Sequence, residues 1–246
     1  MTRAVVMGDI HLYYDKTEVE KIEEVVDSLL EDPPDTLVLG GDIYELWRRD
    51  LAGVMWGSDW FTQAMRELQD AGTRVEYVVG NHDEWMIRHT MDAIEYPFGV
   101  SMDYWFSSGG EDFFVTHGHK YEPLYNPVSN DILSITNDWF GSIAGRLWEN
   151  RPAPGNLLEQ GFLAAAGPGA SYLDPEHASK SAWRRDLIHA GIEAESGEES
   201  WGIYGHTHVP FIDDERKLAN WGSFTDGRAT YIEVEDGDIE LIDLFE

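Results

Sequence analysis

The sequence predicts an α/β fold in which a parallel sheet is covered on both faces. Short apolar runs alternate with amphipathic helical segments through residues 3–79, an order that brings parallel strands into one sheet. Small and polar residues follow each run, at the strand ends where such folds place functional loops. We expect a single domain over residues 1–246, because this length allows one large core and nothing in it argues for two folds.

The first strand and helix are bounded by recognisable signals. The run from Arg3 to Met7 is typical of a short buried strand. A helix is expected to open at Thr17, where Glu20 three residues later would complete a capping box, and to stop before the prolines at 33–34. Its apolar stripe at helical spacing consists of Ile22, Val25, Val26, Leu29 and Leu30.

The same alternation repeats once more. Thr36 to Leu39 predicts a second strand, and Arg74 to Val79 predicts a third. Between them we expect a helix from Ser58 to Ala71, with Gly72 as its C-terminal signal. The side chains expected to face the core are Phe61, Ala64, Met65 and Leu68.

Beyond residue 112 the pattern changes. A strand from Phe113 leads into His117, and a stretch at about 121–196, broken by Pro and Gly, precedes a strand from Trp201 to Tyr204. We interpret the stretch as a helical insertion whose apolar residues are either core or a substrate-binding cap: Ile132, Ile135, Trp139, Phe140, Ile143 and Leu147. The tail predicts a three-stranded meander over 217–221, 229–234 and 239–244, with a turn at 235–238.

The net charge is the unusual feature of the composition. The 47 Asp and Glu residues outnumber 17 Lys and Arg, which gives a formal charge of −30. We interpret this as a solvated acidic surface whose self-repulsion high salt would screen. Our hypothesis is therefore an origin in a salt-accumulating organism such as a haloarchaeon. The same charge opposes nucleic-acid binding, which depends on Lys and Arg patches.

The sequence lacks Cys and lacks any long apolar run, and these two absences bound the chemistry and the location. Without Cys, any metal must be held by His, Asp, Glu or Asn. No stretch approaches the roughly 20 apolar residues of a membrane span, and the chain runs from Met1 almost directly into a strand. We therefore expect a cytoplasmic protein without a signal peptide. Peripheral membrane contact stays open, and no oligomeric state is predicted.

Five short motifs of metal-binding residue types lie at predicted strand ends. In an extended segment, residues two apart point the same way, so Asp9 and His11 are expected to converge on one ion. Each motif alone has an ordinary explanation as a turn or cap, but five in this order predict a metal site. The motifs are Asp9-Ile10-His11, Gly40-Gly41-Asp42, Gly80-Asn81-His82-Asp83, His117-Gly118-His119 and Gly205-His206-Thr207-His208.

This ordered set resembles the calcineurin-like metallophosphoesterase superfamily over nearly the whole chain. The resemblance implies a four-layer αββα sandwich with a helical insertion, and a site for two divalent cations. One ion would be held by Asp9, His11, Asp42 and His208. The other would be held by Asp42, Asn81, His117 and His206, so that Asp42 bridges the two.

Two cations at such a site suit phosphoester hydrolysis. They would bind phosphoryl oxygens and lower the pKa of a bridging water, so that a bridging hydroxide attacks phosphorus. Sulfur-free N/O ligation favours Mn²⁺, with Fe, Zn, Mg or Ni as alternatives. By resemblance, His82 faces the scissile phosphate and stabilises or protonates the leaving oxygen. Glu45 is either the acid that orients His82 or a solvated surface acid.

The run from Leu39 to Trp47 is similar to the UDP-2,3-diacylglucosamine pyrophosphate hydrolase branch, as is Asn220-Trp221-Gly222-Ser223. Two departures separate this chain from that branch, which usually has Arg at the position of His82 and Asp at that of His119. The expected substrate is therefore a small phosphodiester or pyrophosphate, nucleotide-linked or lipid-like. The alternatives are a nuclease of the superfamily and a metal-binding module without catalysis.

Overall fold

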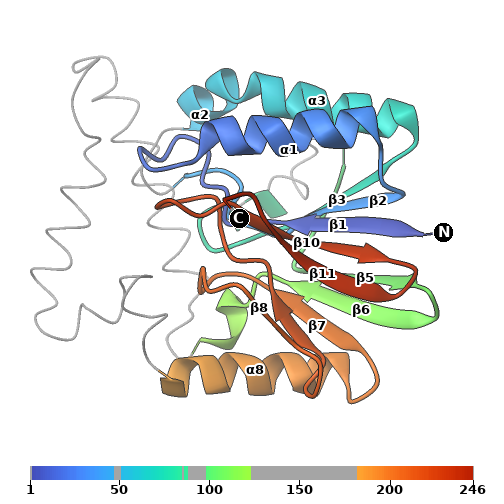
Figure 1. Cartoon of the computed structure of the whole chain (residues 1–246). Helices are drawn as coiled ribbons and strands as arrows, with labels where there is room; N and C mark the ends of the chain where they lie inside the picture. Colours follow the sequence, from blue (N-terminus) through green and yellow to red (C-terminus); the bar gives the residue numbers. More distant parts are fainter. Residues whose placement is uncertain (1, 47–50, 85, 88–97, 123–181, 246) are drawn as a thin grey trace, which may run out of the picture.

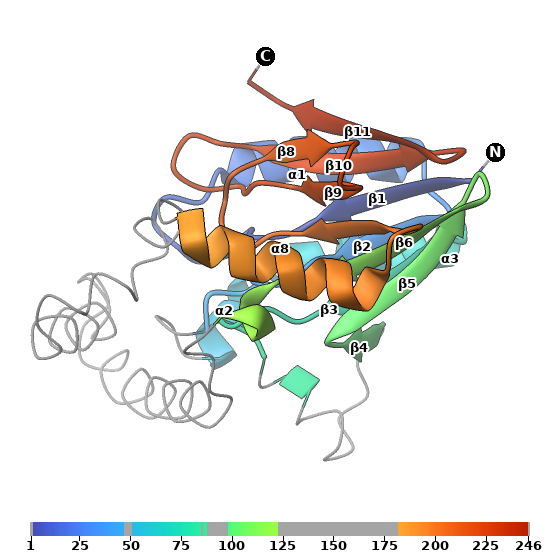
Figure 2. The ribbon, with the colours of Figure 1, turned by 90° about the horizontal axis from the view of Figure 1, so that it is seen from below.

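The computed structural model describes residues 2–46, 51–84, 86–87, 98–122 and 182–245, which form four layers (Figure 1). Helices α1 (Val19–Glu31) and α3 (Asp59–Ala71) cover one face of a six-stranded sheet, and α2 (Leu51–Gly57) precedes α3. A five-stranded sheet packs on the other face, and helix α8 (Ala182–Ser196) covers its far side (Figure 2). The predicted αββα sandwich is therefore confirmed.

The six-stranded sheet is mixed rather than purely parallel. Its strand order is β11 (Asp238–Asp243), β10 (Thr230–Glu235), β1 (Arg3–Met7), β2 (Thr36–Leu39), β3 (Arg74–Val78), β4 (Gly99–Ser101). The last four are parallel, while β10 runs antiparallel to both β1 and β11. The expectation of a wholly parallel sheet is wrong because the chain returns through a C-terminal hairpin, which needs no crossover helix.

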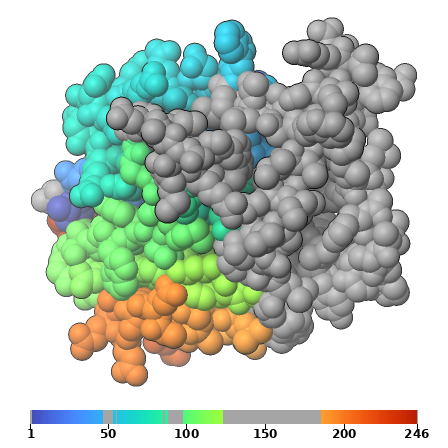
Figure 3. Space-filling view, turned by 180° about the vertical axis from the view of Figure 1, so that it is seen from behind, coloured from blue at the N-terminus to red at the C-terminus, as the bar shows by residue number. Residues whose placement is uncertain are grey.

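The five-stranded sheet contains the remaining strands. Its order is β5 (Asp103–Ser108), β6 (Glu111–Thr116), β7 (Trp201–Tyr204), β9 (Leu218–Asn220), β8 (Phe211–Asp213). Strands β6, β7 and β9 are parallel, so their carboxyl ends share one edge. Figure 3 shows the layers from behind, running from the α3 segment in cyan, through β5 and β6 in green, to α8 in orange.

Three apolar clusters fill the spaces between the four layers. In β1, alternate side chains divide between two of them, because successive residues of a strand point to opposite faces. Val5 and Met7 pack beneath α1 and α3, whereas Ala4 and Val6 face the second sheet. The third cluster joins that sheet to α8 through Phe114, Tyr204, Leu218, Ile188 and Ile192.

The sequence pattern predicts the buried faces of the helices better than it predicts their caps. All four residues predicted to face inward from α3 are buried, and Gly72 ends that helix in the left-handed conformation at φ 108°. In α1 the stripe is buried except for Leu30, which is partly exposed. The capping box is wrong, since Glu18 occupies the N-cap and the Thr17 hydroxyl donates instead to the His11 carbonyl at 2.6 Å.

The predicted three-stranded meander is also wrong. Its first strand, β9, belongs to the five-stranded sheet, and only β10 and β11 form the expected hairpin in the other sheet. Most of the predicted insertion, including Trp139 and Phe140, lies outside the described residues, but its end is helix α8 of the outer layer. No helix among the described residues is long and apolar enough to span a membrane.

Candidate metal centre

The strand register brings the predicted motifs to one edge of the sandwich. Met7, Leu39 and Tyr77 lie near the ends of three parallel strands that pair in register, so the loops that follow are neighbours. Strands β6 and β7 end at the same side of the second sheet, where His117 and the 205–208 motif follow. The site therefore lies across the ends of both sheets.

At five of the seven predicted ligands the backbone is left-handed rather than extended. Positive φ angles between 49° and 65° occur at Asp9, His11, Asp42, His206 and His208. Residues other than Gly rarely adopt this conformation, and such strain tends to accumulate at functional sites. Asp9 and His11 do converge, but the extended-segment reason is wrong, since left-handed turns bring them together.

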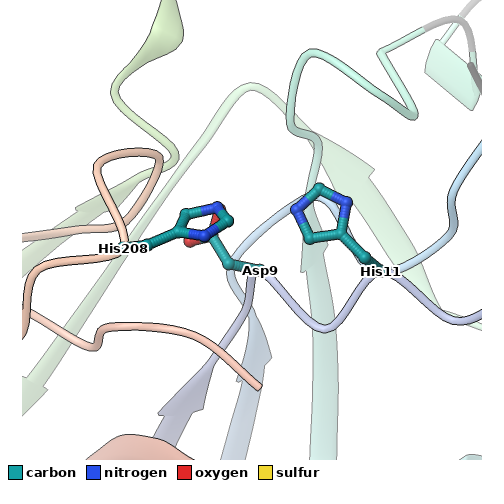
Figure 4. A group of neighbouring side chains, drawn as sticks. All are labelled: Asp9, His11 and His208. Atoms are coloured by element: carbon teal, nitrogen blue, oxygen red, sulfur yellow. The ribbon is translucent and has the colours of Figure 1, made fainter. Parts of the chain in front are cut away.

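Asp9 lies at the centre of one group of possible ligands. Its fully buried carboxylate places Oδ1 3.1 Å from His208 Nε2 and 3.3 Å from His117 Nε2. Figure 4 shows the Asp9 carboxylate next to the His208 imidazole, with the His11 imidazole to the right. Asp9, His11 and His208 each offer one donor atom close enough to share a cation.

Asp42 belongs to the neighbouring groups. Its Oδ2 lies 3.4 Å from His117 Nε2, 3.8 Å from His11 Nε2 and 3.9 Å from His82 Nε2. The backbone N–H of His82 donates to the other oxygen, Oδ1, at 2.8 Å. Possible metal-binding groups therefore form with His117 and His206 on one side and with His11 and His82 on the other.

Two buried atoms of the set suit a bound cation. His11 Nε2 and Asn81 Oδ1 have no hydrogen-bond partner within the part of the chain that the structure describes. Leaving such atoms unpaired is costly, and a divalent cation would satisfy both. With two buried carboxylates and several imidazoles beside them, the residues fit a hard or borderline divalent ion.

Glu45 contacts two histidines at once. Its Oε1 accepts a hydrogen bond from His82 Nδ1 at 2.8 Å, and its Oε2 accepts one from His11 Nδ1 at 3.1 Å. All three side chains are buried. Because a carboxylate can only accept, each imidazole carries its proton on Nδ1 and turns Nε2 toward Asp42. The contact expected from the sequence is present, whereas its catalytic role stays a prediction.

Four further residues hold the ligands in place. The His206 Nε2–H donates to Glu122 at 3.0 Å, which leaves Nδ1 as the nitrogen able to bind a cation. His119 Nδ1 lies 3.0 Å from His117 Nδ1. Asp83 accepts from the Gly80 and Ile43 backbones at 2.6 and 2.8 Å, and the Trp221 indole donates to Asp9 at 2.8 Å.

Sequence reasoning gave none of these four residues a part in holding the candidate ligands in place. Asp83 and His119 lie inside the motifs themselves, and Trp221 lies in a run already noted for its resemblance. Their positions in or near the motifs could have indicated that these three residues lie at the site. Glu122 lies outside every motif, and nothing in the sequence marks it.

The charged side chains in this cluster shift one another's pKa values. Burial alone would raise the pKa of Asp9, but the neighbouring His208 and His117 lower it well below its usual value. Burial likewise opposes a charge on His117, yet the Asp42 and Asp9 carboxylates raise its pKa to about 10. Burial lowers the pKa of His119 to about 4, which keeps it neutral as an acceptor for His117. The site is thus strongly attractive to cations.

Several solved structures are similar to this chain. A dimetal phosphatase from Danio rerio is similar in structure at 13% identity, over 98% of this chain and 95% of its own, with a TM-score of 0.50. A zinc complex of Vps29 from Entamoeba histolytica has 12% identity over 99% and 98%, with a TM-score of 0.42. At its level of identity the phosphatase shows the fold alone, and no curated protein matches the chain. A family model described as calcineurin-like phosphoesterase matches residues 2–210, so the chain belongs to the calcineurin-like phosphoesterase family.

Proposed function

We propose that this chain hydrolyses a phosphodiester or pyrophosphate bond with the help of two divalent cations. The observation that carries the proposal is the position of Asp42, whose buried carboxylate belongs to two adjoining groups of possible ligands. A shared carboxylate is the feature that holds two cations at the short spacing used in phosphoryl transfer.

The ligands divide into two sets that share Asp42. In the proposed arrangement, one cation is held by Asp9, His11, Asp42 and His208, and the other by Asp42, Asn81, His117 and His206. When bound, the two cations would neutralise the phosphoryl oxygens and make water a stronger nucleophile. Mn²⁺ is the proposed ion because the donors are nitrogen and oxygen without sulfur, with Fe, Zn, Mg and Ni as alternatives.

His82 is the proposed proton donor to the leaving group. Hydrolysis places the hydroxyl of water on phosphorus and requires one proton on the departing oxygen. Glu45 holds His82 Nδ1, so the opposite nitrogen, Nε2, is the one directed toward the ligand cluster, 3.9 Å from Asp42. A protonated imidazole there would release its Nε2 proton to the leaving oxygen and regain one from the attacking water.

The proposed substrate is small and either nucleotide-linked or lipid-like. The formal charge of −30 opposes binding along a polyanionic nucleic-acid backbone, which disfavours the alternative of a nuclease. A metal-binding module without catalysis is disfavoured because His82 and Glu45 stand in contact beside the ligands, an arrangement that metal binding alone does not require.

Turnover of bis-p-nitrophenyl phosphate tests the proposal. The chain is stripped of metal, supplied with Mn²⁺ and compared with Asp42→Ala purified in parallel, which controls for contaminating phosphatases. We expect hydrolysis that depends on Mn²⁺ and is absent from the variant. Metal binding without hydrolysis of this diester, of uridine diphosphate esters or of a short oligonucleotide would favour the module, and preference for the oligonucleotide would favour the nuclease.

A further inference from the structure

Trp221 is a fully buried residue that joins the second sheet to the metal centre. It follows β9 directly, and its backbone N–H donates to the Tyr204 carbonyl at 3.1 Å, which places it beside the end of β7. From there its indole Nε1–H donates to Asp9 Oδ2 at 2.8 Å. The donor follows a strand of one sheet and the acceptor follows a strand of the other, so this hydrogen bond links the two sheets at their ends.

The indole is one of two donors that hold the Asp9 oxygen facing away from the histidines. Oδ2 accepts from Trp221 and also from the backbone N–H of His206 at 2.9 Å. Those two donors occupy Oδ2 and leave Oδ1 toward His208 and His117, at 3.1 and 3.3 Å. Without the indole N–H, a buried carboxylate would lose one of the two bonds that fix its rotation.

Three glycines in or next to the motifs make room for the indole. A Cβ added to Gly8 would lie 2.8 Å from Trp221 Nε1, one on Gly40 would lie 2.5 Å from Cη2, and one on Gly205 would lie 2.2 Å from Cζ2. The backbones before Asp9, before Asp42 and before His206 therefore rest directly on one aromatic ring. Such close approach requires glycine, so the ring and these loops fit each other as a unit.

We propose that Trp221 is a positioning residue that orients the Asp9 carboxylate for metal binding. It acts through Asp9 and does not itself bind the cation. The inference rests on the proposed function, because it assumes that Asp9 is a ligand. The test therefore measures metal binding, and its outcome does not depend on whether the chain hydrolyses a phosphoester.

The experiment compares Trp221→Phe with Trp201→Phe. Trp201 is the matched control because it is buried in the same apolar cluster, yet it lies at the first residue of β7, whereas the ligands follow the last. Both changes remove an indole, but only the first removes a donor to Asp9. We expect Trp221→Phe to weaken Mn²⁺ binding on the order of 10–100-fold by calorimetry, while Trp201→Phe binds like the parent.

A spectroscopic measurement separates orientation from loss of packing. Trp221→Phe identifies the Trp221 signal among the indole N–H resonances of the 10 Trp residues in a ¹⁵N-labelled protein. We expect this resonance to shift when Zn²⁺ is added to the parent and when Asp9 is replaced by Asn. If Trp221→Phe does not fold, benzothienylalanine at 221 keeps the ring shape and removes only the N–H.

Two outcomes would overturn the proposal. The first is parental metal affinity in a folded Trp221→Phe or benzothienylalanine variant. The second is an equal loss of affinity in Trp201→Phe, which would assign the effect to packing. A chain that binds Mn²⁺ with the expected difference between variants, but hydrolyses nothing, would reject the proposed function and leave this inference standing.

Discussion

The two sheets contribute different chemistry to the metal centre. The loops after β1, β2 and β3 of the six-stranded sheet supply both carboxylates, the amide and the Glu45–His82 pair. The five-stranded sheet supplies imidazoles, namely His117 after β6 and the two histidines after β7. The six-stranded sheet also supplies the His11 imidazole, so it offers both kinds of donor, but the proposed set of ligands is complete only with the histidines of the other sheet.

Contacts across the boundary between the sheets join these two halves. Asp9 reaches His208, and Asp42 reaches His117, so each carboxylate of one sheet faces an imidazole of the other. The apolar cluster between the sheets holds them at this spacing. We expect changes at His82 to affect turnover directly, and changes to the carboxylates or to the link between the sheets to affect metal binding and stability.

Loss of the shared carboxylate should have the largest effect. Asp42→Ala removes the proposed ligand common to both cations, so we expect at least one ion to be lost together with nearly all activity. Plasma emission counts the ions per chain after dialysis. Asp70→Ala on the exposed side of α3 is the control for a lost surface acid. Two retained ions with a near-parental rate would remove the bridging assignment.

Loss of His82 should separate turnover from metal binding. His82→Ala is expected to keep both ions while slowing hydrolysis by about 10²–10⁴-fold, the usual range for general acid–base help. The loss should shrink for p-nitrophenol, because a good leaving group needs less protonation. An equal loss for alkoxide and p-nitrophenol would instead assign His82 to charge stabilisation of the phosphoryl oxygens.

Local sequence patterns predict the N-terminal half of the fold well. Strands β1 and β2, and the buried face of α3, match their expected residues, because period and flanking signals there agree with tertiary packing. The tail shows the limit of the method. Strands β9 and β10 have similar apolar patterns, yet they lie in different sheets, because pairing with β7 is a long-range choice that local sequence does not record.

Sequence patterns likewise predict some features of the candidate site and not others. Motifs at strand ends predict which residue types gather, since parallel strands end at one edge. The left-handed backbone at Asp9 and Asp42 cannot be predicted, because only tertiary packing holds such residues there. The role of Trp221 is also hidden, because it lies 212 residues from the carboxylate to which it donates.

Glu45→Gln should produce a mixed effect of intermediate size. The carboxylate accepts from both His11 and His82, whereas an amide oxygen can replace only one of those acceptors and its NH₂ group opposes the other. We expect weaker metal binding through His11 and slower turnover through His82, each on the order of 10–100-fold. Calorimetry and diester kinetics measure the two separately, and saturating Mn²⁺ should restore only the part due to binding. If saturating Mn²⁺ restores turnover completely, Glu45 acts only in metal binding. If the variant binds Mn²⁺ with parental affinity, Glu45 acts only through His82.

Withdrawal of metal should have the smallest effect, which is a loss of stability rather than of structure. The proposed cations bind residues of both sheets, so they bind the native state and not the unfolded chain. At a free concentration 100 times Kd, such a ligand stabilises the native state by about 2.7 kcal/mol. For a chain of this size, that corresponds to a melting temperature about 5–11 °C higher with metal than without.

Scanning calorimetry with Mn²⁺ and with EDTA measures the difference in melting temperature. The ionic strength is kept constant because the net charge of −30 makes stability sensitive to salt. The apolar clusters between the layers do not depend on metal, so the stripped protein should still unfold cooperatively. Asp42→Ala should show a smaller difference, and an equal one would mean that the stabilising ions bind elsewhere on this acidic chain.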